Sequence, residues 1–253
     1  MLSAFGRVVK TADLRRKLLF TLAMIVLYRV GTFIPAPGVS YGNVQQCLNA
    51  NVTSGGVYDI VNLFSGGALL QLSIFALGVM PYITASIIIQ LLRVVIPRFQ
   101  ELHDEGAQGQ AKLTQYTRYL TIALALLNAT TIVSMARSGV LLGNCPGIIP
   151  QDDVLHILLI IVTLCAGTTV IMWMGEQITE RGVGNGMSLL IFTSIASSFP
   201  SALGSIQRTH GWGIFAAVCG IGLLVMLAVV YVEQSVRRIP VQYAKRMIGR
   251  RTI

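Results

Sequence analysis

Charged side chains are scarce in this sequence. Asp, Glu, Lys and Arg together make up 11% of its 253 residues, whereas soluble domains contain roughly 25%. Hydrophobic residues make up 54%, and the mean hydropathy is +0.70. This composition excludes an ordinary soluble domain and predicts an all-α protein that crosses a lipid bilayer several times.

Patterns typical of enzymes and metal sites are also missing. The three histidines form no HExxH pair, and the four cysteines have no metal-ligand spacing. No Asp or Glu lies in the core of an expected span, although coupled transporters usually carry such groups as relays. We therefore expect a passive conduit without a cofactor, rather than a pump or an enzyme. The residues concerned are His103, His156, His210, Cys47, Cys145, Cys165 and Cys219.

Residues 18–35 are expected to form a first span rather than a cleaved signal peptide. Arg29 and Pro35 end the apolar run, and no small-residue cleavage site follows it. An arginine at the centre of a span costs about 2.5 to 3.5 kcal/mol. Arg29 lies toward one end, so we expect its side chain to extend to the membrane surface.

The longest uncharged stretch lies between Asp59 and Arg93. It contains 33 residues, and a spanning helix needs roughly 20. Gly66 and Gly67 interrupt it, and glycine costs a helix interior about 1 kcal/mol relative to alanine. The pattern predicts a broken second span, with a short element over 58–70 and a helix over 71–95. A broken helix lines a cavity or is buried in protein; a long, kinked structural helix is the alternative.

Gaps between charged residues predict the other spans. The connection 97–117 is polar and is expected to project, with a flexible tip at 106–110. The glycine-rich connection 175–186 is expected to be a tight turn, since a phosphate-binding loop needs a preceding strand. The six expected spans cover residues 18–35, 58–95, 119–136, 154–175, 187–204 and 211–232.

Lysine and arginine are distributed unevenly along the chain. Of the 19, 16 lie in segments that six spans place on one side of the membrane. Positive residues accumulate in cytoplasmic segments, so both termini are predicted to be cytoplasmic. These segments are the N-terminal tail, residues 93–118, Arg181 and the tail after residue 236. Cys47 and Cys145 then lie in outer loops, and a disulfide between them stays open.

Several stretches resemble the bacterial SecY family, the channel subunits of the general protein-secretion translocase, and the resemblance covers essentially the whole chain. It implies a location in the bacterial inner membrane and ten spans in two halves. Residues 1–207 would supply the first five spans, and 208–253 the sixth and part of a cytoplasmic loop, making one incomplete membrane domain. The matching stretches are 64–68 (FSGGA), 74–92 (IFALGVMPYITASIIIQLL), 112–119 (KLTQYTRY), 175–186 (GEQITERGVGNG) and 237–246 (RRIPVQYAKR).

The resemblance also implies a pore ring and a plug. It assigns Val79, Ile83 and Ile191 to the hydrophobic ring at the constriction. Branched aliphatic side chains offer water and ions nothing to bind, so a narrow ring closes by dewetting. Helix packing alone is the alternative for these residues. The implied plug consists of Asn62, Leu63, Phe64, Ser65, Gly66, Gly67, Ala68 and Leu69; its two glycines predict low stability and easy displacement.

Basic residues in the C-terminal tail suit the phosphates of ribosomal RNA or an acidic partner, although they could serve only to set topology. The partners implied by the resemblance are SecE, SecG, the SecA motor ATPase, the ribosome, unfolded secretory polypeptides and the lipid bilayer. The docking candidates are Arg237, Arg238, Lys245, Arg246, Arg250 and Arg251.

Two other functions stay open at this stage. A half-size solute permease would also place a broken helix at its binding site. A truncated translocon fragment would insert into the membrane without function. Saturable, gradient-driven uptake of a small solute would favour the permease, and contact of Ile83 with a translocating polypeptide would favour the channel.

Overall fold

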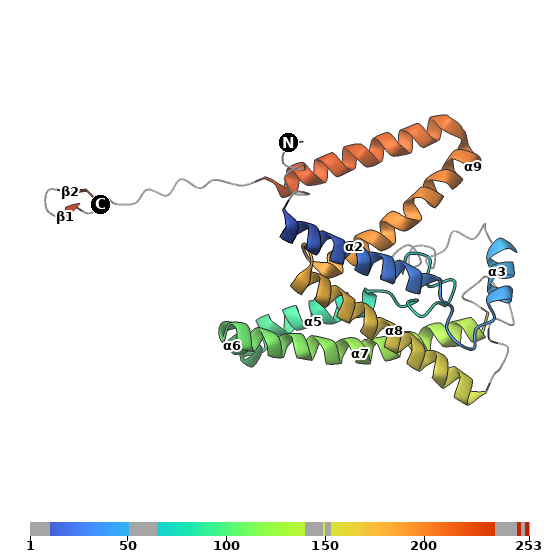
Figure 1. Ribbon diagram of the computed structural model, residues 1–253, viewed down its shortest axis with the longest axis horizontal. Helices are drawn as coiled ribbons and strands as arrows, with labels where there is room; N and C mark the ends of the chain where they lie inside the picture. The colour runs from blue at the N-terminus through green and yellow to red at the C-terminus, as the bar shows by residue number, and fades with distance from the viewer. Residues whose placement is uncertain are drawn as a thin grey trace. The chain divides into compact units, whose positions relative to one another are not determined.

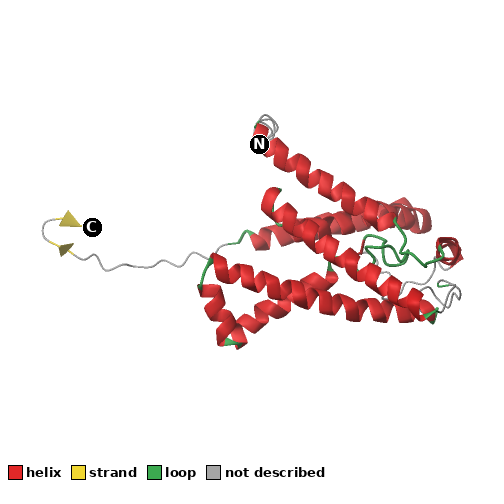
Figure 2. Cartoon of the chain, turned by 60° about the horizontal axis from the view of Figure 1, so that its bottom comes forward, coloured by secondary structure: helices red, strands yellow, loops and turns green. Residues whose placement is uncertain are grey.

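The computed structural model describes residues 11–50, 65–139, 149, 153–235, 247–248 and 251–252. Regular structure within these ranges is almost entirely helical (Figures 1 and 2), which confirms the all-α class. Two antiparallel strands of two residues each, β1 (Met247–Ile248) and β2 (Arg251–Thr252), are the exception. The chain divides into two compact units, Met1–Pro200 and Ser201–Ile253. The division expected after residue 207 stays a prediction.

Helix α7 is the centre of the first unit. It packs against α5, α6 and α8, and α2 packs against α8 (Figure 1). The helices of this unit are α2 (Ala12–Phe33), α3 (Tyr41–Ala50), α5 (Met80–Val95), α6 (Pro97–Asp104), α7 (Ala107–Arg137), α8 (Val154–Arg181) and the first part of α9 (Gly186–Glu233).

Among the described residues, four helical segments are long and apolar enough to cross a membrane. They are α7, α8 and the two parts of α9, Gly186–Thr209 and Gly211–Glu233, which are separated at Gly211 (φ 77°). The pair α5 and α6, bent by 101°, would make a fifth. Helix α2 is not among them, because every 18-residue window within it contains at least three basic residues. The expected count of six spans is therefore not confirmed.

The second span differs from its prediction. A helix was expected over 71–95, but α5 begins only at Met80, and residues 66–79 form consecutive turns around a single-residue bridge at Ser73. Gly66, Gly67 and Gly78 have φ of 67°, 90° and 56°, a left-handed conformation that glycine adopts without steric cost. Leu72 is also left-handed, with a φ of 45°. Pro81 lies in the first turn of α5, where its missing N–H interrupts no helical hydrogen bond.

Backbone hydrogen bonds fix these turns to the end of α2. Ala36 N donates to Leu72 O at 2.9 Å, and Ile74 N donates to Ile34 O at 2.9 Å. The backbone of α8 also lies close to these turns, since a Cβ on Gly167 would collide with the carbonyl of Ile74. The non-helical stretch is thus held within the helical bundle, as backbone at membrane depth requires.

The polar connection between the second and third spans is a helical hairpin. The expected flexible tip at 106–110 is wrong, because α7 begins at Ala107, directly after a left-handed Gly106 (φ 76°). A Cβ on Gly109 would collide with the carbonyl of Leu102 in α6, so the two helices lie in close contact. Helix α7 therefore extends 12 residues before the span expected at 119–136.

The connection between α8 and α9 is shorter than expected. Helix α8 continues to Arg181, beyond its predicted end at 175. Asn185 Oδ1 accepts a hydrogen bond from Met187 N at 3.1 Å, which caps the start of α9. Val183 N donates to Thr21 Oγ1 of α2 at 3.2 Å. A tight turn does exist here, but it consists only of residues 182–185.

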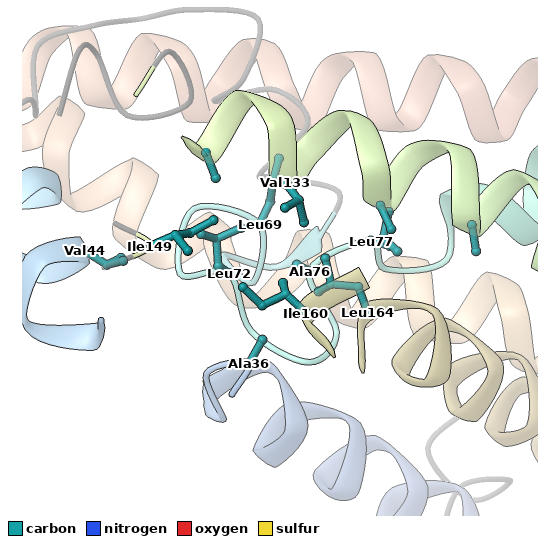
Figure 3. Close-up of a cluster of buried hydrophobic side chains, with 13 residues drawn as sticks. Ala36, Val44, Leu69, Leu72, Ala76, Leu77, Val133, Ile149, Ile160 and Leu164 are labelled. Carbon is teal, nitrogen blue, oxygen red and sulfur yellow. The ribbon is translucent and has the colours of Figure 1, made fainter. Parts of the chain in front are cut away.

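One of two apolar cores lies between α7, α8 and the turns before α5 (Figure 3). We call it the wall cluster. Buried residues of α7 repeat every four positions from Leu113 to Val133, and the small side chains among them allow close helix contact. Its buried members are Ala36, Val44, Leu69, Leu72, Ala76, Leu77, Ala125, Ala129, Val133, Ala136, Ile149, Ile160 and Leu164.

Candidate functional site

The second apolar core joins α2, α5, α8 and the start of α9, and we call it the ring cluster. Three of its nine buried members are methionines. The buried members are Met24, Tyr28, Phe75, Val79, Ile171, Met174, Ile178, Met187 and Leu190; Phe20, Ile74, Tyr82, Ile83 and Ile191 are half-buried against them.

All three expected ring residues belong to this cluster. Val79 is 3% exposed and directly precedes α5. Its carbonyl accepts a hydrogen bond from Ile83 N at 3.2 Å, so both side chains lie on one helical face. Ile191 reaches the same cluster from α9. The structure thus brings together residues more than 100 positions apart in the sequence.

Tyr28 anchors α2 beside this cluster. Its ring is fully buried and stacks on Phe75, with centroids 5.8 Å apart. Its hydroxyl is hydrogen-bonded to Ser194 Oγ of α9 at 2.7 Å, which supplies the polar partner that a buried hydroxyl requires. A Cβ on Gly31, one helical turn later, would collide with the Phe75 ring. The helix α2 is therefore held closely against the turns that precede α5.

The described part of the expected plug is packed rather than loose. Ser65 is 4% exposed, and its Oγ accepts a hydrogen bond from Leu69 N at 3.0 Å. Ala68 and Leu69 are 0% and 2% exposed, and Leu69 belongs to the wall cluster. A Cβ on Gly67 would meet open space, so this position needs glycine for its backbone conformation alone. Asn62, Leu63 and Phe64 lie outside the described residues.

Arg29 contacts the expected plug, and its extension to the membrane surface stays a prediction. Its Nη1 donates to the carbonyl of Gly66 at 2.8 Å, and its guanidinium lies 5.0 Å from the centre of the Phe33 ring. Sequence reasoning missed this contact with the plug segment. The one signal for it was the isolated charge in an expected span, because such a charge needs a partner in the membrane.

An ion pair links α7 and α8 outside the two cores. Arg118 donates through Nε and Nη2 to both carboxylate oxygens of Glu176, at 2.8 and 2.6 Å. Sequence reasoning missed this pair as well. Glu176 opens the stretch 176–181, which was expected to be loop and belongs to α8. The two parallel hydrogen bonds give the contact between these helices a specific geometry.

The expected docking surface and disulfide are not described. Arg251 lies in β2. Cys47 lies in α3, but the position of its side chain is not described. The remaining members lie outside the described residues: Arg237, Arg238, Lys245, Arg246, Arg250 and Cys145.

The family model for SecY matches residues 73–253. This chain belongs to the SecY family. It is 63% identical over all 253 residues to the protein translocase subunit SecY of Micrococcus luteus, and 59% identical over 259 aligned positions to that of Streptomyces scabiei. The chain spans 58% and 59% of the length of these relatives.

Solved channels share the fold of this SecY-family chain at 20% sequence identity. One is Sec61 in the canine ribosome–channel complex from the endoplasmic reticulum, with a TM-score of 0.57 over 89% of this chain and 49% of that one. Another, described as a protein-conducting channel, has a TM-score of 0.58 over 94% and 52%. Together with its apolar helices, these matches make the chain part of a multi-pass membrane protein.

Proposed function

We propose that this chain forms the first half of a protein-conducting channel in the bacterial inner membrane, with both termini cytoplasmic. Membership of the SecY family supports the channel. The excess of lysine and arginine in alternate connections supports the orientation. The channel would be passive and would carry no catalytic residue, because energy would come from the partners that drive the polypeptide.

One observation carries the proposal. The three candidate ring residues come from α9 and from α5 with the residue before it, and they meet in one apolar cluster. Next to it, Ser65, Ala68 and Leu69 of the candidate plug are buried. An apolar constriction beside a removable segment excludes water and ions at rest. Because such a ring has no hydrogen-bonding groups to select a sequence, it suits the passage of unfolded chains in general.

Crosslinking tests this proposal in a channel completed to the length of its relatives. A photoreactive amino acid at Ile83 should crosslink to a stalled secretory polypeptide. Val162 of α8 is the matched control, since it is a branched side chain, 54% exposed, outside both clusters. We expect crosslinks from Ile83 and none above background from Val162. Equal yields would contradict the ring assignment, and gradient-driven uptake of a small solute would favour a permease.

We also propose that the basic tail docks the ribosome or the SecA motor, while SecE and SecG complete the complex. The density of arginine over residues 237–251 supports this, and phosphate contacts of this kind weaken with salt. Replacing Arg237 and Arg238 by Gln in the completed channel should weaken ribosome binding and flatten its dependence on salt. Binding that is unchanged at every salt concentration would assign these residues to topology alone.

A further inference from the structure

We propose that Arg29 is a latch that holds the plug segment closed through the carbonyl of Gly66. This inference deepens the proposed function and rests on it. The observation behind it is the 2.8 Å hydrogen bond from Arg29 Nη1 to Gly66 O, which joins α2 to a segment 37 residues later. Arg29 is thus a positioning residue for the plug, not part of the ring.

The position of Arg29 is fixed from both sides along α2. Tyr28, the preceding residue, is tied to Ser194 and stacked on Phe75. Phe33, one turn later, presents its ring to the guanidinium at 5.0 Å, a favourable arrangement for a cation. A side chain held in this way loses little further freedom when it donates a hydrogen bond, so the contact is preorganised.

Gly66 fits this contact in two independent respects. Its φ of 67° is left-handed, a conformation that favours glycine. A Cβ there would lie 3.2 Å from Arg29 Nη1 and 3.3 Å from Ser194 Cα, closer than ordinary packing allows. Any larger residue would therefore push the plug segment away from both α2 and α9. The glycine permits the close approach that the latch requires.

If the plug is released, the guanidinium of Arg29 loses its acceptor, the carbonyl of Gly66, and needs another. A groove of about 530 Å³ between α2 and α9 is lined by Arg29 together with Thr193 and Ser197. Both hydroxyls can accept a hydrogen bond from the guanidinium after Gly66 departs. The remaining lining is apolar: Ile25, Val26, Leu189, Phe192 and Ala196. The guanidinium thus bonds to a backbone carbonyl while the plug is in place, and hydroxyls would take over as acceptors after release.

Thiol labelling of the plug tests the latch without any transported polypeptide. In the full-length channel, with the natural cysteines replaced, Ala68→Cys reports on the plug because Ala68 is 0% exposed. Ala129→Cys, also 0% exposed but on α7, is the matched control for general loosening. Labelling by a water-soluble maleimide is then compared between the parent, Arg29→Met and Arg29→Lys.

We expect Arg29→Met to accelerate labelling at position 68 by about tenfold or more, as loss of a hydrogen bond to a charged donor predicts. Arg29→Lys, which keeps the charge, should give an intermediate rate. Gly66→Ala should accelerate labelling in the same direction. Position 129 should keep its parental rate in all variants.

Two results would overturn the latch. The first is an unchanged rate at position 68 in Arg29→Met. The second is an equal rise at positions 68 and 129, which would assign Arg29 to the stability of the whole fold. Neither result depends on the crosslinking of Ile83, so failure of the latch is distinguishable from failure of the channel proposal.

Discussion

The two apolar cores of the first unit are built from different side chains. Five of the thirteen buried members of the wall cluster are alanines. The nine buried members of the ring cluster, among the described residues, include three methionines and no alanine. Both cores therefore exclude water, but alanines pack within the wall cluster, whereas larger side chains of the ring cluster pack over Gly31 and Gly175.

This difference indicates different mechanical properties. Alanine has no side-chain rotamers to change, so helices joined through alanines have one close-packed arrangement. Methionine is unbranched, flexible and polarisable, and it adapts to irregular neighbours. Met187, for example, packs with its sulfur over Gly175 of α8. A rigid wall beside an adaptable ring suits a constriction that must change its diameter while its scaffold stays intact.

Overpacking the wall should give the larger effect on stability. Ala125 is 1% exposed on the four-residue stripe of α7. Ala125→Leu should lower the free energy of unfolding by about 1 to 3 kcal/mol, because a close-packed interface has no room for the added carbons. Unfolding in mixed detergent micelles measures this change.

The matched control for that substitution is Ala123→Leu on the exposed face of the same helix. It should leave the free energy of unfolding within about 0.5 kcal/mol of the parent. If both variants lose the same stability, the rigidity assigned to the wall cluster is wrong.

A conservative change in the ring should give the smaller effect. Met187→Leu nearly conserves volume, so we expect it to cost less than about 1.5 kcal/mol in unfolding free energy. Because the branched side chain adapts less well, the same variant should slow polypeptide passage in the completed channel. Measuring both quantities on one preparation checks the contrast. A loss of stability larger than that of Ala125→Leu would reverse our ranking of the two cores.

The sequence predicts the later spans well because their limits depend on charge. The expected span at 211–232 corresponds to the helix Gly211–Glu233, where Glu233 ends the uncharged run. Burying a charged group in lipid is costly, so the gap between charges marks the span closely. The same reasoning misplaces the start of α7, since a helix continues into water at no comparable cost.

The turns before α5 could not be predicted from charge and hydropathy. Residues 71–79 are apolar enough for a helix, and nothing in their hydropathy distinguishes them from α5. Their turns depend on tertiary contacts, such as the hydrogen bonds of Leu72 and Ile74 with the chain after α2. Tertiary context of this kind overrides local propensity.

The sequence likewise predicted some residues of the candidate site and missed others. Val79, Ile83 and Ile191 were found through a family resemblance, and the structure gathers them in one cluster. The contact between Arg29 and Gly66 was not found, because two residues 37 positions apart share no periodic pattern. Sequence reasoning detected the isolated charge but not its partner.

The hydroxyl of Thr21 has a consequence for how the proposed ring widens. It donates to Lys17 O at 2.9 Å and accepts from Val183 N at 3.2 Å. The bond between Tyr28 and Ser194 lies seven residues further along α2, about 10 Å away. Two attachments at that separation resist pivoting between α2 and residues 183–194, which include the start of α9. Ile191 lies between them in sequence, so we expect it to keep its position relative to α2 when the proposed ring widens.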